Sequence, residues 1–416
     1  MNLLYNAGIS LYGLGMRIAA LRSDKVRRLL KGQREALPYL RHTIDSDHGY
    51  IWIHAASLGE FEQGRPFIEM VRRLHPQAKI LLTFFSPSGY EVRCNFPLVD
   101  AVSYLPLDSP HNVKAFLDAV KPRMALFIKY EFWGNYLQEL RRRGIPTYII
   151  SSIFRKSQIF FKPWGGMFRS MLRCYTHIFV QDDNSMRLLS DIGVYNVSVA
   201  GDTRFDRVTD IMRERPDVPQ AEAISEDSPC LTIVAGSTWP PDEELLLPYV
   251  NSHPEVRLII APHEVRTDRI EDIVSKLNRP VVCLSKATPE QAAKADCLIV
   301  DCYGKLSGVY RYGDIAYIGG GFGAGIHNIN EAAVYDMPVL FGPHYRKFKE
   351  ASDMIECGGA FTFSDKAGFI SAIDPLVSDS EYLHEAGRAA GHYIREHLGA
   401  TQRVYTALSS IIESIN

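Results

Sequence analysis

A chain of 416 residues with 46% hydrophobic and 23% charged residues is long enough for two domains, each with a sizeable core. The formal net charge of -2 at pH 7 excludes the broad basic surface that nucleic-acid binding by phosphate neutralisation requires. The 7 cysteines are odd in number and show no Cys-x-x-Cys spacing, which indicates reduced, buried thiols rather than a disulfide framework or a metal site.

The amino-terminal segment allows two interpretations. Residues 3–21 are mostly apolar but contain Asn6 and Arg17, so they are weak as a membrane-spanning helix, and they have no small-residue cleavage site. The next segment interleaves cations with apolar residues such as Val26 and Leu29, a basic amphipathic pattern suited to an anionic membrane surface. These cations are Arg22, Lys25, Arg27, Arg28, Lys31 and Arg34. A solvated helix packed on the first domain explains the pattern equally well.

From residue 50 onward, short apolar runs alternate with amphipathic segments, which predicts parallel, doubly wound α/β sheets. The runs expected as strands in the first half are Tyr50–His54, Lys79–Phe84, Ala101–Leu105, Met124–Ile128, Thr147–Ile150, His177–Val180 and Val197–Val199. Those in the second half are Leu231–Ala235, Arg257–Ala261, Val281–Leu284, Leu298–Val300, Ile315–Ile318 and Val339–Phe341. Between them the polar, proline-containing stretch 207–228 is the expected linker. We therefore predict two similar lobes with a cleft between them, and ligands beyond the carboxyl ends of the strands.

The first such strand end is followed by Ser57-Leu-Gly-Glu60, a sequence that fits a capping box at the start of a helix. The same carboxylate is also placed to act as a general base, because a helix dipole favours its ionised form. The spacing alone favours the helix cap over the base.

Two further charged residues follow predicted strands of the first lobe. Glu131 is expected at the same edge as Glu60, where a pair of carboxylates suits acid-base or electrostatic work on a sugar, although a helix cap is the structural alternative. Arg204 ends the lobe and would supply a cation to an acidic substrate or a departing phosphate. A surface salt bridge to Asp202 or Asp206 is the alternative role for Arg204.

The second lobe contains the densest glycine run of the chain. Residues 319–324 match the G-x-G-x-x-G/A pattern of dinucleotide-binding oxidoreductases, but that pattern normally follows the first strand of a domain rather than a late one. We favour a loop that leads to a helix capped by Asn328, with loop amides holding a phosphate and Glu331 accepting ribose hydroxyls. The hydroxyl-rich turn at 236–238 precedes a second helix start that can hold an anion.

In this order the motifs resemble those of the bacterial Kdo transferases, which transfer 3-deoxy-D-manno-octulosonic acid (Kdo) from CMP-Kdo to a lipid A precursor. The matching segments are 54–60, 106–108, 131–133, 201–206, 236–238, 243–244, 327–328, 331–333, 342–343 and 348–349. The resemblance implies a GT-B fold of two Rossmann-like, doubly wound lobes with an interdomain cleft. Residues 1–206 would form the acceptor-binding domain with a membrane-associating helix, 207–228 the linker, and 229–416 the CMP-sugar-binding domain. Its last helices would be free to pack back on the first domain.

The resemblance also implies roles for individual residues. Glu60 would deprotonate the glucosamine 6-hydroxyl of the acceptor, and Glu131 and Arg204 would stabilise the transition state of an inverting transfer. The implied donor-binding residues are Ser237, Thr238, Pro262, His263, Tyr303, Gly304, Lys305, Asn328, Ile329, Asn330 and Glu331. The family needs no metal and no cofactor, since CMP-Kdo is a substrate, and it works on the phospholipid surface of the cytoplasmic face of the inner membrane.

Several positions depart from the family pattern. Lys129-Tyr130-Glu131 stands where Glu-Thr-Glu is usual, Arg204 replaces a lysine, and the donor-side run 262–266 is one residue short, so either His263 or Arg266 takes the role of its arginine. Tyr303-Gly-Lys305 replaces Met-Gly-Glu, and 328–331 reads Asn-Ile-Asn-Glu instead of Asn-Pro-Leu-Glu. The alternative functions are another sugar-nucleotide enzyme of the same fold, such as an epimerase, a dinucleotide-binding oxidoreductase, and a membrane-binding protein without catalysis.

Overall fold

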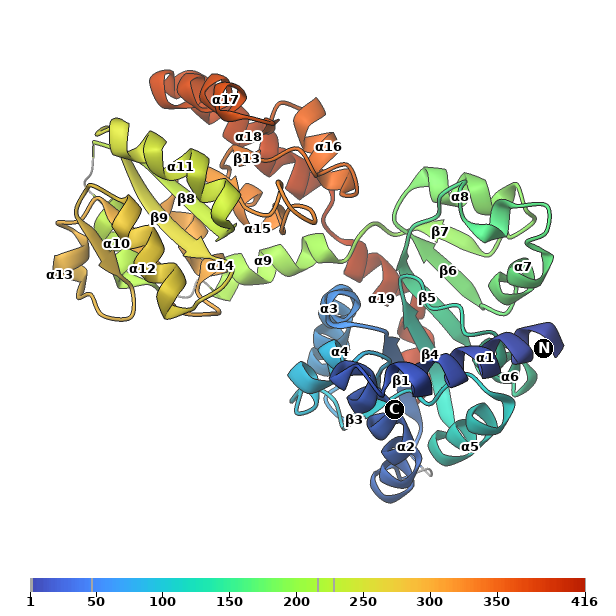
Figure 1. The fold of residues 1–416 in the computed structure, drawn as a ribbon. Helices are drawn as coiled ribbons and strands as arrows, with labels where there is room; N and C mark the ends of the chain where they lie inside the picture. Colours follow the sequence, from blue (N-terminus) through green and yellow to red (C-terminus); the bar gives the residue numbers. More distant parts are fainter. Residues whose placement is uncertain (1–2, 46–47, 215–216, 227–228, 416) are drawn as a thin grey trace. The chain divides into compact units, whose positions relative to one another are not determined.

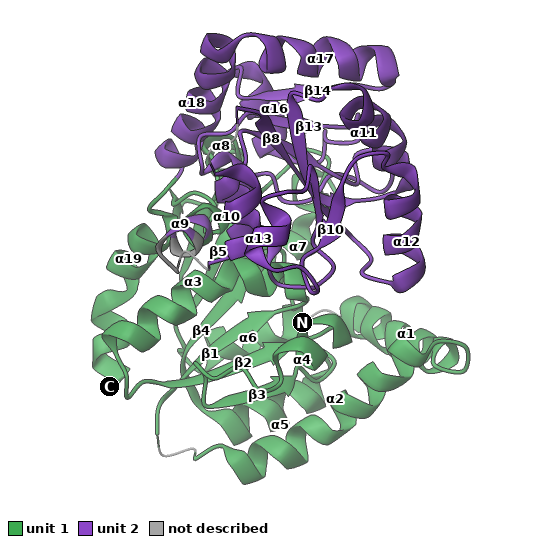
Figure 2. Cartoon of the chain, turned by 90° about the vertical axis from the view of Figure 1, so that its left-hand side faces the viewer, with its two compact units in different colours: residues 1–207, 398–416 green, residues 208–397 purple. Residues whose placement is uncertain are grey.

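The computed structural model describes residues 3–45, 48–214, 217–226 and 229–415 (Figure 1). The chain forms two compact units, which Figure 2 colours separately. Unit 1 comprises residues 1–207 and 398–416, and unit 2 comprises residues 208–397. Each unit is built on its own parallel sheet, and the two are described here one after the other.

Unit 1 contains a seven-stranded parallel sheet in the order β3-β2-β1-β4-β5-β6-β7. Its strands are β1 (Tyr50–Ala55), β2 (Lys79–Phe84), β3 (Ala101–Tyr104), β4 (Pro122–Ile128), β5 (Thr147–Ser152), β6 (His177–Val180) and β7 (Val197–Val199). Its helices are α1 (Leu3–Ala19), α2 (Asp24–Thr43), α3 (Leu58–Leu74), α4 (Pro87–Arg93), α5 (Pro110–Val120), α6 (Gly134–Arg142), η1 (Ile159–Phe161), α7 (Gly166–Leu172), α8 (Asp183–Ser190) and α19 (Ala400–Ile415). The strand order reverses between β1 and β4, which makes this the switch point of the sheet.

The two faces of this sheet carry separate cores because side chains alternate along each strand. In β1, Trp52 packs with α5 and α6 on one face, whereas Ile51 and Ile53 pack on the other face with α3 and α19. Figure 2 shows α2 and α3 on opposite sides of the strands. Helix α19, from the end of the chain, thus completes the fold of unit 1 through Val404 and Leu408.

Unit 2 contains a second seven-stranded parallel sheet in the order β10-β11-β9-β8-β12-β13-β14. Its strands are β8 (Leu231–Thr238), β9 (Val256–Pro262), β10 (Val281–Cys283), β11 (Cys297–Ile299), β12 (Ile315–Ile318), β13 (Val339–Phe341) and β14 (Ala360–Thr362). Its helices are α10 (Pro219–Ser225), α11 (Pro240–Ser252), α12 (Thr267–Lys276), α13 (Pro289–Ala292), α14 (Leu306–Val309), η2 (Tyr310–Tyr312), α15 (Asn330–Ala333), α16 (Lys349–Glu356), α17 (Lys366–Ser378) and α18 (Ser380–Glu396). Helix α9 (Arg204–Glu214) begins in unit 1 and continues in unit 2.

The prediction of two doubly wound parallel lobes is confirmed by these sheets. Every predicted strand overlaps an observed one. Strand β14 was not predicted, because its three residues are too few to produce a periodic pattern and they follow two glycines.

The stretch 207–228, expected as a linker, contains helices in its described residues. The end of α9 and the whole of α10 lie there. Ala221 and Ile224 of α10 are fully buried, and Gln220 donates a hydrogen bond to the Ala287 carbonyl at 3.0 Å, so α10 is part of the fold of unit 2. The polar composition concealed this short helix, since only one face of it is apolar.

Candidate active site

Glu60 and Glu131 follow neighbouring strands at the switch point of the unit 1 sheet. Glu60 lies in the first turn of α3, after β1, and Glu131 lies in the loop after β4. Since β1 and β4 are adjacent and parallel, their carboxyl ends bring the two residues to one edge. The structure therefore places these two predicted residues together.

Glu60 closes the first turn of α3 as the sequence suggested. The Ser57 backbone N–H donates to its Oε2 at 2.9 Å, and the Ser57 hydroxyl donates to the same oxygen at 3.2 Å. Burial and the charge of Glu131 raise the pKa of Glu60 above its ordinary value, although Ser57 and His54 oppose the rise. A carboxylate with a raised pKa accepts a proton more readily than an ordinary glutamate. Burial and Glu131 thus outweigh the influence of the helix start.

Glu131 is held by its surroundings and does not cap the next helix. Its side chain is 7% exposed, His54 Nε2 lies 2.9 Å from its Oε2, and Trp133 Nε1–H donates to the same oxygen. The cap of α6 comes instead from Asp108, which accepts hydrogen bonds from the backbone N–H groups of Asn135 and Tyr136 at 3.0 and 2.9 Å. The helix-cap alternative for Glu131 is therefore wrong.

The backbone is strained at the ends of two strands of unit 1 and one strand of unit 2. Lys129, Ser151 and Ser237 adopt φ values of 67°, 53° and 55°, in the left-handed region that non-glycine residues rarely occupy. Lys129 follows β4, and the two serines lie at the ends of β5 and β8. Such strain concentrates at functional sites, where the surrounding fold maintains it.

Arg204 forms the ion pair that the sequence offered as its alternative role. Its Nε and Nη2 donate to Oδ2 of the buried Asp202 at 2.9 and 2.7 Å. Burial opposes ionisation of Asp202, but Arg204 and Gln63 lower the pKa of this carboxyl below its usual value. Burial also raises the pKa of the Tyr130 phenol, against the positive charges of Arg155 and Arg204. The tyrosine that departs from the family pattern is therefore influenced by the charge of the arginine that does so.

Asp206 serves a different purpose from Asp202. Its carboxylate accepts hydrogen bonds from the backbone N–H groups of Gly399 and Thr401, both at 2.6 Å. Gly399 directly precedes α19 and Thr401 lies in its first turn, where backbone amides have no partner within the helix. Asp206 thus fixes the carboxyl-terminal helix onto unit 1.

A polar network ties α1 to the loop that carries Glu131. The Tyr5 hydroxyl donates to Asp108 Oδ2 at 2.6 Å and accepts from the Gly134 N–H at 3.0 Å, while Asn135 Nδ2 donates to Asn6 at 2.9 Å. Burial raises the pKa of Asp108 to about 6, against the hydrogen bonds from Tyr5, Asn135 and the next residue. The amino-terminal helix is therefore held by polar contacts next to the candidate site.

Tyr5→Phe is expected to loosen α1. It leaves the buried Asp108 carboxylate and the Gly134 N–H each short of a partner, which costs about 1–3 kcal/mol. Hydrogen exchange should therefore become faster in α1 and at the start of α6. Tyr12→Phe, at an exposed tyrosine of the same helix, is the control. Equal exchange in both variants would contradict this role of Tyr5.

The predicted donor-binding residues of unit 2 gather at the carboxyl edge of its sheet. They follow β8, β9, β11 and β12, which are neighbours in the order β11-β9-β8-β12. The set comprises Ser237 and Thr238 on β8, Pro262 and His263 on or after β9, Tyr303 to Lys305 after β11, and Asn328 to Glu331 after β12. The structure therefore brings all four predicted segments to one edge.

Two residues that sequence reasoning did not select also lie at this edge. Trp239 stacks on His263 with ring centroids 4.5 Å apart, and His263 stacks on His327 at 4.7 Å. Burial, with a contribution from His263, lowers the pKa of His327, which favours the neutral ring. Each of the three rings follows a strand of this sheet, either directly or after a loop. This position after a strand is the sequence signal by which Trp239 and His327 could have been selected. Arg266 instead forms exposed ion pairs. His263 and Arg266, the two residues considered for the role of the family's donor-side arginine, therefore lie in different surroundings.

The glycine run at residues 319–325 allows close packing of the backbone rather than forming an anion-binding loop. A Cβ at Gly319 would lie 2.2 Å from the Ser237 carbonyl oxygen, and one at Gly321 would lie 2.5 Å from the Gly342 nitrogen. The amides of residues 319, 320, 323, 325 and 327 donate within unit 2. The expectation that the loop amides hold a phosphate is therefore wrong for these five amides.

The helix start after the glycine run also differs from expectation. Helix α15 begins at Asn330, with Ile329 rather than Asn328 at the cap position. The Asn328 side chain accepts from the Asn330 N–H at 3.2 Å and donates to Glu331 at 2.9 Å. The Asn330 side chain is fully buried, and in the described structure neither its Oδ1 nor its Nδ2 has a hydrogen-bond partner.

Two side chains of the donor set are occupied by the fold itself. The Thr238 hydroxyl donates to the fully buried Glu243 at 3.0 Å, and Glu243 pairs with Arg269 at 2.5 Å. The Tyr303 hydroxyl accepts a hydrogen bond from the Val265 N–H at 3.2 Å, although its side chain is largely exposed. Lys305 is exposed at the start of α14.

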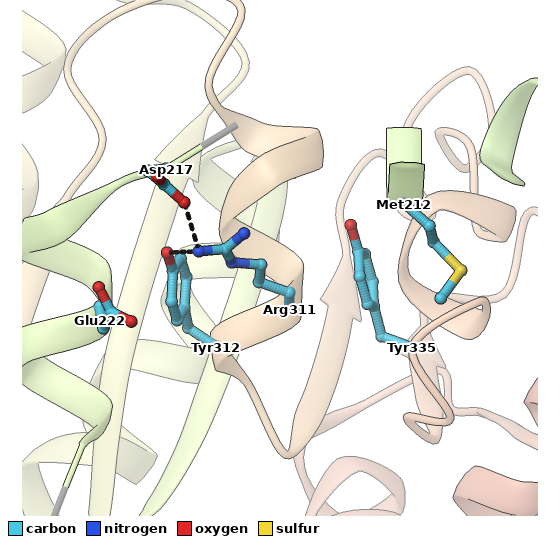
Figure 3. A pocket seen from close by; sticks show the side chains of 6 residues that line it. All are labelled: Met212, Asp217, Glu222, Arg311, Tyr312 and Tyr335. Carbon is cyan, nitrogen blue, oxygen red and sulfur yellow. Dashed lines mark hydrogen bonds and ion pairs between the residues drawn. The ribbon is translucent and has the colours of Figure 1, made fainter. Parts of the chain in front are cut away.

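A pocket of unit 2 lies apart from these residues. Figure 3 shows it between Glu222 of α10, Arg311 and Tyr312 of η2, and Tyr335, with a cavity volume of about 460 Å³. Arg311 donates to Asp217 at 2.9 Å across its mouth. None of the predicted donor-binding residues lines it. Within the described ranges, no group of three His, Cys, Asp or Glu side chains is placed to hold a metal ion.

Known proteins match the chain over most of its length. The family model of 3-deoxy-D-manno-octulosonic-acid transferases (kdotransferases) matches residues 26–207. The 3-deoxy-D-manno-octulosonic acid transferase of Haemophilus influenzae is 26% identical over 377 residues, which cover 87% of this chain and 87% of the relative. That of Rickettsia felis is 28% identical over 347 residues, covering 80% and 72%. The solved structure of UDP-GlcNAc 2-epimerase from Neisseria meningitidis bound to UDP-GlcNAc aligns with a TM-score of 0.61 at 15% identity, over 87% of this chain and 100% of that chain. The similarity to the epimerase structure shows that this chain and the epimerase share a fold.

Proposed function

Because the chain belongs to the 3-deoxy-D-manno-octulosonic acid transferase family of glycosyltransferases, we propose that it transfers Kdo from CMP-Kdo to the glucosamine 6-hydroxyl of a lipid A precursor, with inversion. The observation that supports this proposal best is the pair of carboxylates, Glu60 and Glu131, at the switch point of the unit 1 sheet. Their unequal surroundings suit unequal roles, since one is held by a histidine and a tryptophan and the other only by a serine. Neither an epimerase nor an oxidoreductase fits the family.

In the proposed reaction Glu60 is the base. Its carboxylate leaves Ser57, accepts the proton of the acceptor hydroxyl, and so makes that oxygen a nucleophile. Its raised pKa increases its basicity. Glu131 stabilises positive charge that develops on the sugar, and Arg204 faces the negative charge of the departing CMP. Two hydrogen bonds to Asp202 fix the orientation of the Arg204 guanidinium.

We assign the CMP half of the donor to the carboxyl edge of the unit 2 sheet. The rings of Trp239, His263 and His327 provide flat surfaces for a base, and Asn330 brings an unsatisfied buried amide. Asn328 presents Glu331 for hydrogen bonds to ribose hydroxyls. These are groups that a nucleotide can use without a metal ion.

The test of the proposed function supplies CMP-Kdo, generated in situ, and a tetraacylated lipid A precursor. We expect release of CMP together with a lipid heavier by one Kdo unit or more, read by mass spectrometry. Parallel reactions contain UDP-GlcNAc or NAD with a 2-hydroxy acid. Turnover in either parallel reaction, with no transfer to the lipid, would overturn the proposal.

We also propose that α1 and α2 lie on an anionic phospholipid surface at the cytoplasmic face of the inner membrane. Leu11, Leu14 and Ile18 form a stripe at helical spacing along α1, with exposed fractions of 69%, 53% and 61%. An exposed apolar stripe of this kind in a folded chain marks an interaction surface. Among the residues that the structure describes, no helix is both long and apolar enough to cross a membrane.

Removal of exposed cations should weaken this binding. Arg27, Arg28 and Lys31 lie within 4.0 Å of carboxylates, so the variant replaces the exposed Arg22, Lys25 and Arg34 with glutamine. If each cation contributes about 1 kcal/mol, affinity for phosphatidylglycerol vesicles should fall about 100-fold at low salt and less at high salt. Vesicle sedimentation measures this affinity.

The matched control removes the same charge from unit 2, at the exposed Lys286, Lys294 and Lys366. It should bind vesicles as the native chain does. Serine at Leu11, Leu14 and Ile18 should weaken binding at all salt concentrations, because that contribution is apolar. Unchanged binding of both amino-terminal variants would show that α1 and α2 are only a packed pair of helices.

A further inference from the structure

His54 is fully buried at the end of β1 and contacts both neighbouring strands. Its Nδ1 lies 2.9 Å from the Thr83 hydroxyl and 3.0 Å from the Thr83 carbonyl oxygen on β2. Its ring packs edge-on against Phe127 of β4, with centroids 5.8 Å apart. Trp52 Nε1–H donates to the Thr83 hydroxyl at 2.8 Å. The imidazole therefore has one fixed orientation.

The other ring nitrogen faces Glu131. His54 Nε2 and Glu131 Oε2 are 2.9 Å apart, a hydrogen-bond distance that requires a proton between them. If Thr83 donates to Nδ1, the neutral ring carries its proton on Nε2. If Nδ1–H donates to the Thr83 carbonyl, a second proton is held between Nε2 and Oε2. In either arrangement one proton lies between His54 Nε2 and Glu131 Oε2.

This proton matters because two carboxylates share the edge of the sheet. Two nearby carboxylates disfavour each other's ionisation, so one of them must be compensated if the other is to act as a free base. His54 and Trp133 both donate to Oε2 of Glu131, and these hydrogen bonds compensate the negative charge of that carboxylate. Glu60 has only Ser57 as a hydrogen-bond donor in the described structure.

We propose that His54 is a positioning residue of the transfer reaction, which holds Glu131 by Oε2 and retains a proton there so that Glu60 alone takes the proton of the acceptor. The inference rests on the proposed function. The titratable groups around the imidazole are Glu131 directly, and Glu60 and Tyr175 beyond it, since the Tyr175 hydroxyl donates to the Glu131 carbonyl. Thr83, Trp52 and Phe127 complete its surroundings and do not titrate in the working range.

The test uses His54→Gln in the full chain. Glutamine keeps a neutral N–H donor but cannot hold the additional proton that the imidazole can share with Oε2, so the charge of Glu131 acts more strongly on Glu60 and Glu60 becomes harder to ionise. We expect kcat to fall about 100-fold, a magnitude typical of a displaced catalytic group, with little change in the KM for CMP-Kdo. The acid limb of the kcat/KM profile should move to higher pH. Glu131→Gln should move it to lower pH, because the neighbouring charge is removed.

His177→Gln is the matched control, since His177 is a second partly buried histidine of unit 1, bonded to Ser198 at 2.9 Å. It should leave the profile unchanged. A lower kcat in His54→Gln with an unmoved acid limb would reduce His54 to a packing residue and overturn the proposal, as would native kinetics.

A spectroscopic readout separates this inference from the proposed function. In the native chain the ¹⁵N-coupled proton signal of His54 Nε2, identified by its loss in His54→Gln, should persist across the neutral pH range. It should broaden by solvent exchange in Glu131→Ala. Persistence of the signal in a chain that transfers no Kdo would refute the proposed function alone, whereas absence of the signal from an active chain would refute the role of His54 alone.

Discussion

Glu60→Gln is expected to lower the rate of Kdo transfer by about 10²- to 10⁴-fold, the contribution of a positioned general base. The amide keeps an oxygen that can accept from the Ser57 N–H at the start of α3, so the helix cap survives while the basic oxygen pair is lost. Binding of CMP-Kdo should be unaffected, because Glu60 belongs to unit 1 and the proposed nucleotide residues belong to unit 2. Single-turnover transfer and CMP-Kdo titration measure the two effects.

The pH profile supplies a second test of the same residue. Burial and Glu131 raise the pKa of Glu60, so the rate of the native chain should begin to fall on acidification at a pH above the ordinary glutamate value of 4.5. The residual activity of Glu60→Gln should not show this acid limb. Glu62→Gln is the control on the same helix, since Glu62 pairs with the arginines at positions 65 and 93. Native turnover by Glu60→Gln would exclude Glu60 as the base.

Arg204→Met is expected to impair both transfer and stability. Loss of a cation that stabilises departing negative charge should cost about 10²- to 10³-fold in kcat. The change also leaves Asp202, whose side chain is 6% exposed, without its ion-pair partner, which costs about 3 kcal/mol for a buried charge. The melting temperature and the rate of hydrogen exchange near β7 measure this loss.

The direction of the pH effect follows from Asp202. Arg204 lowers the pKa of Asp202 in the folded native chain, so the pair contributes stability above the ordinary aspartate pKa, and this is lost as pH falls through the lowered value. Without Arg204, burial raises the pKa of Asp202. The stability difference between Arg204→Met and the native chain should therefore shrink on acidification.

A double variant separates the two effects of Arg204. Asp202→Asn combined with Arg204→Met removes both charges and should recover most of the stability without recovering activity. Arg204→Lys should retain part of both, since it keeps the charge but has one donor group in place of the guanidinium. Recovery of transfer in the double variant would show that Arg204 serves only to neutralise Asp202.

The regular elements near the site were predictable because their signals are local. Strand β1 reads as an apolar run and the capping box begins two residues after it, so Glu60 was placed at a strand end correctly. The same holds for Glu131 after β4. The role of Asp108 as the cap of α6 was not predictable, because the residues concerned are 27 and 28 positions apart. Asp206 caps α19 across 193 positions, which no sequence period reveals.

The sequence by itself determined the two doubly wound sheets, the strand ends at which polar residues collect, and the resemblance to a known family, because apolar periodicity and motif order are properties of the chain. Only the tertiary structure decided which side chains and backbone groups each site residue contacts. It placed His54 against Glu131, paired Arg204 with Asp202, and used the glycine run to pack loops. The reason is physical: ionisation and hydrogen bonding depend on distance and burial in space, and strands adjacent in a sheet are distant in the chain.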